Sequence, residues 1–179
     1  MKELTDPLFH FLDLLEEHQI PYALIGGLAV SVLGRERFTK DVDFTISIDE
    51  QKAKFLENHF KNDPSYRVHL INFVSSPKIP DMFRIFWKEV PVDLLVANCD
   101  YQMELVLRAS PKTVLGRAIK VATPEDIIIL KLIADRPRDR EDIEVLRKSY
   151  KTLDWPYIEK WCREWEVLDR LEKIRESKK

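Results

Sequence analysis

The chain has 179 residues, of which 45% are hydrophobic and 34% charged, and this composition is typical of one folded core with a small appendage. Its 29 basic and 31 acidic residues leave a formal net charge of −2, which excludes a global attraction to nucleic acid or to an anionic membrane. Cys99 and Cys162 lack the spacing of a disulfide framework or a zinc site, and no segment approaches the ~20 apolar residues of a membrane span, so we expect a cytoplasmic protein.

The N-terminal sequence predicts a strand, a glycine turn and a helix. Apolar residues recur every three or four positions over residues 6–18, which predicts a first helix. A short apolar strand over residues 22–25 then runs directly into Gly26 and Gly27. Residues 28–33 predict the helix that follows this turn.

The next segment predicts a strand, a helix and three further strands. Residues 42–48 read as a strand in which Asp41 and Asp43 share one side, because strand side chains repeat every two residues. Asp49 is a predicted N-cap residue for a helix that runs to about residue 61. Strand-like segments follow at residues 66–74, 82–87 and 90–96, the last two joined by a hairpin at Lys88 and Glu89.

The remaining sequence is mainly helical. Residues 101–109 predict a short helix, and residues 112–121 predict a small hairpin. Thr123 and Pro124 have the pattern of a helix start, a capping hydroxyl before a proline. Further helices are expected at residues 124–134, at 139–148 and from 155 to the end. We therefore expect an α/β (α+β) fold, with a core at residues 1–122 and a C-terminal helical segment at residues 123–179 packed on it.

Three carboxylates predict a site for two magnesium ions, with manganese as a substitute. Asp41 and Asp43 point the same way from one strand, and Asp93 lies in an apolar strand where an acid is costly unless it meets a cation. Nucleotidyl transfer uses two such ions about 3.5 to 4 Å apart, one at the attacking hydroxyl and one at the leaving pyrophosphate. The three aspartates are therefore the predicted metal ligands and catalytic residues.

The glycine turn predicts a binding site for phosphate groups. A triphosphate approaches the backbone closely only where no side chain intervenes, and a helix N-terminus offers amide hydrogens to anions. Gly26 and Gly27 meet both conditions. Arg37 and Lys40, on the connection before the acids, are expected to neutralise phosphate oxygens.

These motifs resemble a known superfamily. The run Leu24-Ile-Gly-Gly-Leu-Ala29, the run Asp41-Val-Asp-Phe44 and the separate Asp93 are similar to the signature of the DNA polymerase β-like nucleotidyltransferases. The resemblance implies a mixed β-sheet flanked by helices and a nucleoside triphosphate substrate. It implies transfer of a nucleoside monophosphate to an acceptor hydroxyl with release of pyrophosphate, in which Asp93 helps to deprotonate the acceptor.

Residues 122–142 are similar to the AbiEii-like minimal nucleotidyltransferases of bacteria and archaea. In that branch, residues like Lys131, Arg138, Asp139 and Asp142 lie beside the nucleotide pocket. The alternative for Lys131 is a surface lysine whose aliphatic stem is buried. The alternative for Arg138, Asp139 and Asp142 is a solvent-exposed helix start with charge pairs three residues apart. The second glycine of the turn replaces a serine that polymerising members use, and the long C-terminal extension of full AbiEii toxins is not present in this sequence.

Other functions stay open. The chain could be a nucleotide sensor or one component of a toxin–antitoxin pair, or it could hydrolyse phosphoesters with a metal-bound water. The acceptor could be a tRNA end, a protein hydroxyl, a small metabolite or an aminoglycoside-like drug. A local basic patch that could receive RNA comprises Arg35, Arg37, Lys40, Arg136, Arg138 and Arg140. Tryptophans in the C-terminal segment favour internal packing, with a homodimer contact as the alternative.

Overall fold

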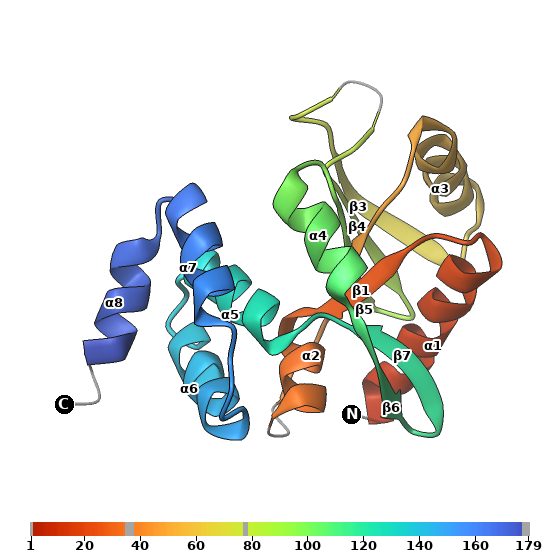
Figure 1. Cartoon of the computed structure of the whole chain (residues 1–179). Helices are drawn as coiled ribbons and strands as arrows, with labels where there is room; N and C mark the ends of the chain where they lie inside the picture. The colour runs from red at the N-terminus through yellow and green to blue at the C-terminus, as the bar shows by residue number, and fades with distance from the viewer. Residues whose placement is uncertain (1, 35–37, 77–78, 177–179) are drawn as a thin grey trace.

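The computed structural model describes residues 2–34, 38–76 and 79–176, which form one mixed seven-stranded sheet with helices around it (Figure 1). The strands are β1 (Tyr22–Ile25), β2 (Val42–Ile46), β3 (Tyr66–Asn72), β4 (Met82–Trp87), β5 (Val90–Val96), β6 (Ser110–Val114) and β7 (Arg117–Val121). The helices are α1 (Lys2–Glu17), α2 (Gly26–Leu33), α3 (Glu50–Asn62), α4 (Asp100–Arg108), α5 (Pro124–Ala134), α6 (Asp139–Ser149), α7 (Trp155–Glu164) and α8 (Leu168–Glu176). The expected α/β class, with a mixed sheet flanked by helices, is confirmed.

The sheet order is β3-β4-β5-β2-β1-β7-β6, and its centre brings distant parts of the sequence together. Strands β2 and β5 pair in parallel, which places Asp43 directly beside Asp93. The β4–β5 hairpin is antiparallel and places Arg84 on the other side of Asp93. Strand β1 pairs antiparallel with β2 and ends one residue before Gly26.

The two central strands are covered by helices on both faces, and one face is entirely apolar. Val42, Phe44 and Ile46 of β2 are fully buried, as is every second residue of β5 from Val92 to Val96. Helices α1 and α3 cover this face, where Phe11 and Phe60 meet each other. Each fully buried side chain of this size contributes roughly 1.5–3 kcal/mol. Because side chains alternate along a strand, the aspartates between these apolar residues face the opposite side.

Helices α5 and α7 join α4 through a buried polar cluster around Asp126 in α5. The Tyr157 hydroxyl of α7 donates to Asp126 Oδ1 at 2.7 Å, and the Thr123 hydroxyl donates to Oδ2 at 2.6 Å. Tyr101 of α4 donates to the Asp126 carbonyl at 3.1 Å, and Arg108 lies 3.6 Å from the carboxylate. Burial raises the pKa of Asp126, and these partners compensate its charge.

Several element boundaries differ from the expected ones. Helix α1 starts at Lys2, before the expected residue 6, and so includes Pro7, which removes one backbone hydrogen bond of the helix. Strand β3 stops at Asn72 because the next amides, Val74 and Ser75, donate to the Asp81 carboxylate instead of continuing the ladder. Helix α2 already begins at Gly26. The division into parts at residue 122 stays a prediction.

The tryptophans of the C-terminal segment pack within the chain. Trp161 is buried against Tyr101, with ring centroids 5.1 Å apart, and Trp155 lies under the guanidinium of Arg175. Trp165 stays 41% exposed. A homodimer contact through this region therefore stays a prediction. None of the described helices has the length and apolar character that crossing a membrane requires.

Candidate active site

Three aspartates lie close together at β2 and β5, on the face opposite α1 and α3. Asp43 and Asp93 are neighbours across the β2–β5 pair, and Asp41 precedes β2 by one residue. Asp93 is only 6% exposed, whereas Asp41 and Asp43 are half-buried. The Thr39 hydroxyl donates to Asp41 Oδ1 at 2.5 Å. The expected grouping of these side chains follows from the parallel register, which the sequence alone did not supply.

Gly26 and Asp43 fit together at the start of α2. Gly26 has a φ of +66°, a conformation that favours glycine. A Cβ atom at Gly26 would lie 1.9 Å from Asp43 Oδ2, so no other residue fits here without moving the carboxylate. Gly27 is buried in the first turn of the helix. The absence of a side chain at Gly26 thus lets the Asp43 carboxylate lie against the N-terminus of α2.

Burial and the neighbouring acids disfavour the ionised form of Asp43. The pKa of Asp43 is raised to about 7, mainly by burial and also by the negative charges of Asp41 and Asp93. Lys131 and Arg136 act against this shift. Carboxylate oxygens, such as those of Asp41 and Asp43, are the ligands that Mg²⁺ and Mn²⁺ prefer. The donor set therefore fits such an ion.

Asp93 is held by a residue that the sequence did not single out. Arg84 Nε donates to Asp93 Oδ1 at 2.7 Å, and Arg84 Nη2 donates to Oδ2, so both carboxylate oxygens are engaged. Within the described part of the chain, no group of three or more His, Cys, Asp or Glu side chains is arranged to hold a metal ion. Asp41 and Asp43 are the carboxylates that Arg84 leaves available.

Helices α5 and α6 contribute the other predicted nucleotide-binding residues. Lys131 is 11% exposed and lies between two buried acids, with its Nζ 2.7 Å from Asp139 Oδ1 and 2.8 Å from Asp142 Oδ2. The backbone amide of Arg136 donates to Asp139 Oδ2 at 2.9 Å. These contacts fix the position of Lys131 and link the end of α5 to the start of α6.

An open cleft of about 700 Å³ connects this pair of helices to the segment before β2. It is lined by Phe38, Thr39, Lys40, Asp41, Lys131, Arg136, Pro137, Arg138 and Asp139. The structure thus brings Lys40, Lys131, Arg138 and Asp139 to one cleft that begins at Asp41. Asp43, Asp93 and the glycines lie outside its lining. Arg37 falls outside the described residues.

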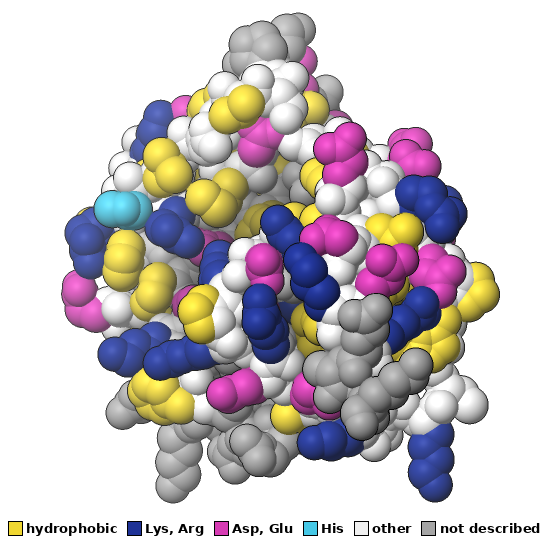
Figure 2. Space-filling model, turned by 90° about the vertical axis from the view of Figure 1, so that its left-hand side faces the viewer, with side chains coloured by type: hydrophobic (Ala, Val, Ile, Leu, Met, Phe, Trp, Pro, Cys, Tyr) yellow, Lys and Arg dark blue, Asp and Glu magenta, His cyan; other side chains and the backbone are white. Residues whose placement is uncertain are grey.

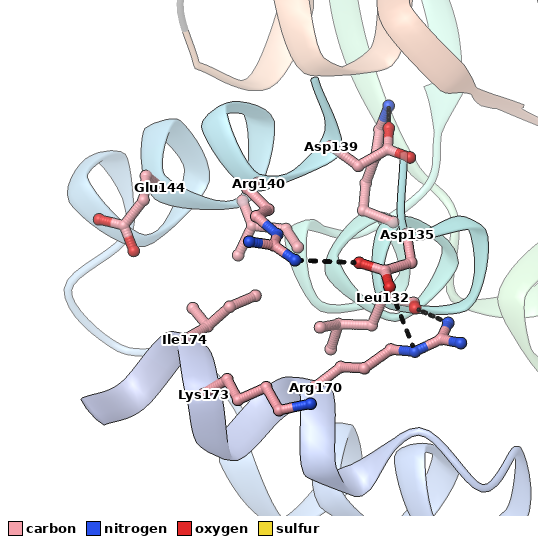
Figure 3. A pocket seen from close by; sticks show the side chains of 10 residues that line it. Leu132, Asp135, Asp139, Arg140, Glu144, Arg170, Lys173 and Ile174 are labelled. Atoms are coloured by element: carbon pink, nitrogen blue, oxygen red, sulfur yellow. Dashed lines mark hydrogen bonds and ion pairs between the residues drawn. The ribbon is translucent and has the colours of Figure 1, made fainter. Parts of the chain in front are cut away.

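A second pocket of about 190 Å³ lies behind Lys131 and Asp139, between α5, α6 and α8 (Figure 3). Arg170 of α8 donates to the carbonyls of Leu132 and Ile133 at 2.8 and 3.0 Å, and it pairs with Asp135 at 3.6 Å. These contacts cap the C-terminus of α5. We interpret the pocket as part of the packing of α8.

On the face that carries the C-terminal helices, the described side chains form no continuous band of one charge. Figure 2 shows Lys and Arg side chains interspersed with acidic and hydrophobic ones across this surface. Among the described residues, this face therefore shows no extended basic surface.

Comparison with solved structures shows the same fold in nucleotidyltransferases. ANT(2")-Ia in complex with adenylyl-2"-tobramycin is 19% identical with a TM-score of 0.62, and the match covers 93% of this chain and 98% of that one. The lincosamide antibiotic adenylyltransferase LnuA, bound to lincomycin, is 21% identical with a TM-score of 0.61, over 82% and 98% of the two chains. An antigenic nucleotidyltransferase-like protein from Paracoccidioides brasiliensis is 23% identical with a TM-score of 0.51, over 81% and 75%. At these identities the likeness concerns the fold alone.

No curated protein matches the chain. A family described as nucleotidyl transferases of unknown function (DUF2204) matches residues 5–172, which include every predicted site residue. The chain therefore belongs to this family of nucleotidyl transferases.

Proposed function

We propose that this chain transfers a nucleoside monophosphate from a nucleoside triphosphate to an acceptor hydroxyl, with two magnesium ions, and releases pyrophosphate. The observation that carries the proposal is the placement of Asp43 between Gly26 and Asp93, with Asp41 one residue before the strand. A phosphate-binding helix start and a set of acids thus share one edge of the sheet.

In this proposal the triphosphate lies between the α2 N-terminus and the cleft at α5 and α6. The backbone amides at Gly26 and Gly27 would face the phosphates, and Lys40 and Arg138 would supply positive charge from the cleft, which Lys131 also lines. Asp139 holds Lys131 in place through the 2.7 Å contact. Arg37 is included in the proposal from its sequence position only.

Asp41, Asp43 and Asp93 are the residues that would hold the ions. When bound, the ions would activate the attacking hydroxyl and neutralise charge on the leaving pyrophosphate. The acceptor oxygen forms a bond to the α-phosphorus, the bond between the α-phosphorus and the α–β bridging oxygen breaks, and pyrophosphate leaves with the electron pair. In this proposal, Asp93 would take the proton of the acceptor hydroxyl once Arg84 releases one of its oxygens.

The acceptor would approach from the β4 side of Asp93, away from the glycine turn. The open face there carries Phe86 and the half-exposed Leu70 beside Arg84. ANT(2")-Ia and LnuA are described with antibiotic molecules, and a small hydroxyl compound is one acceptor class by analogy. A tRNA end and a protein hydroxyl are the other classes to test.

A catalytically weak nucleotide-binding module is the second candidate function. The contact of Arg84 with both oxygens of Asp93 favours it, because a carboxylate held in this way is not free to accept a proton. Such a module would act as a sensor or as a component of a toxin–antitoxin pair, as the AbiEii-like resemblance suggests. A partner chain that co-purifies with the protein would support this function.

The proposal is tested by incubating the purified chain with each α-labelled nucleoside triphosphate, Mg²⁺ and a host extract that contains RNA, protein and metabolites. Parallel reactions use Asp41→Asn/Asp43→Asn and, as a matched control, the exposed Glu172→Gln of α8. We expect label in one acceptor fraction with the native chain and the control only. Nucleotide binding without transfer of label by the native chain would instead favour the sensor or antitoxin function.

A further inference from the structure

Arg84 donates hydrogen bonds to the carboxylate of Asp93 from the neighbouring strand. It lies on β4 directly opposite Asp93 in the β4–β5 hairpin, and its planar guanidinium engages both carboxylate oxygens. The Arg84 side chain is 42% exposed, whereas that of Asp93 is 9% exposed. Arg84 can therefore leave the carboxylate toward solvent without disturbing the buried face of the sheet.

The positive charge of Arg84 acts on the whole group of acids. The hydrogen bond to Asp93 raises the pKa of Arg84, and the charges of Asp93, Asp43 and Asp41 raise it in turn. All three predicted metal ligands thus interact with this one guanidinium. Its charge offsets one of three negative charges and opposes the approach of a cation to Asp93.

We propose that Arg84 is a positioning residue that makes cation binding at Asp93 depend on nucleotide. Without nucleotide, Arg84 holds both oxygens of Asp93 and repels a divalent ion. A nucleoside triphosphate brings several negative charges, which favour the ion and offer the guanidinium phosphate oxygens in exchange for the carboxylate. This inference rests on the proposed function, because it assigns the metal and nucleotide sites to the same edge of the sheet.

The coupling has a direct thermodynamic consequence. If nucleotide releases Asp93 from Arg84, nucleotide strengthens cation binding, and the cation strengthens nucleotide binding by the same factor. Removing Arg84 should abolish most of this coupling by making Asp93 available from the start. The expected change is therefore a gain of cation affinity in the nucleotide-free chain, which misfolding of the variant could not produce.

The test measures Mn²⁺ binding to the full chain by electron paramagnetic resonance of the free ion. Native protein is compared with Arg84→Met and with Arg67→Met, a matched control from the neighbouring strand whose side chain pairs with Glu89 instead. Without nucleotide, we expect Arg84→Met to bind Mn²⁺ at least about tenfold more tightly than the native chain and the control. With a non-hydrolysable triphosphate, the affinity of the native chain should rise toward that of the variant.

Equal Mn²⁺ affinity of Arg84→Met and the native chain without nucleotide would overturn the proposal. If near-ultraviolet circular dichroism shows that Arg84→Met does not fold, Arg84→Lys gives the same test. It keeps the charge but loses the two-pronged contact, and a smaller gain of affinity is expected, with no gain counting against the proposal. Unchanged Mn²⁺ binding by Asp41→Asn/Asp43→Asn would instead show that the proposed metal ligands are wrong, whatever Arg84 does.

Discussion

At the scale of single residues, Gly26 and Asp43 determine each other's position. Both Gly26 and Gly116 have a positive φ, but a Cβ atom would meet Asp43 at Gly26 and nothing within 4 Å at Gly116. We expect Gly116→Ala to lower the free energy of unfolding by about 1 kcal/mol through backbone strain alone. Gly26→Ala should cost at least about 2 kcal/mol more, because the carboxylate must move.

Chemical denaturation of the two glycine variants measures this difference. Gly116→Ala serves as the control for the positive φ. Equal costs for both variants would mean that the Asp43 carboxylate does not lie against Gly26 in solution.

The raised pKa of Asp43 predicts how stability depends on pH. The pKa of Asp43 rises from its ordinary value of 3.8 to about 7 in the folded chain. Between these two pH values, the folded state therefore binds a proton that the unfolded state has released. The contribution of Asp43 to stability is therefore present below pH 4 and is lost as the pH rises to about 7, by up to about 1.4 kcal/mol per pH unit. Asp43→Asn should remove this loss.

The measurement is urea denaturation of the native chain and Asp43→Asn between pH 4 and 8 with a chelator present, and Glu172→Gln serves as the control. The difference in unfolding free energy between the native chain and Asp43→Asn should change over this range. A constant difference would contradict the uncompensated charge on which the metal site is based.

At the scale of elements, Lys131 joins α5 to α6. Replacing it by methionine would remove the ammonium group between the buried Asp139 and Asp142. We expect Lys131→Met to cost about 3 kcal/mol of unfolding free energy, as for other buried ion pairs that lose one partner. Lys160→Met is the control, because Lys160 is 57% exposed and its partner Glu104 is 3.7 Å away, and it should cost less than about 0.5 kcal/mol.

Thermal unfolding and nucleotide titration together separate two functions of Lys131. A large loss of stability supports its role as a link between helices. A Lys131→Met variant of native stability that binds nucleotide poorly would show that the lysine serves the ligand instead.

The β4–β5 hairpin shows which contacts an amino-acid sequence can predict. Once Lys88 and Glu89 are taken as the turn, the antiparallel register follows, and it pairs Arg84 with Asp93. Arg84 also carries the signal that drew attention to Asp93, a charged residue within an apolar strand. Applied to both strands, the same argument would have found the pair.

At the scale of the whole molecule, the contacts that sequence could not supply are those between distant segments. The neighbourhood of Asp43 and Asp93 depends on a parallel pairing across α3 and two strands, which local patterns do not specify. The contact of Lys131 with Asp139 depends on the left-handed turn at Asp135, whose φ is 46°. Periodicity did predict nearly every helix and strand, and the glycines and acids that the sequence singled out lie close together in the fold.

The central claim is transfer of a nucleoside monophosphate, which carries the α-phosphorus of the triphosphate. The most direct test follows the α-phosphorus and the γ-phosphorus separately. The native chain and Asp43→Asn receive Mg²⁺, an acceptor fraction and triphosphate labelled at either the α- or the γ-phosphorus. We predict α-label in the acceptor and γ-label in an equal amount of pyrophosphate, with neither product from Asp43→Asn. Transfer of γ-label to the acceptor, or release of α-label only as free monophosphate, would contradict nucleotidyl transfer.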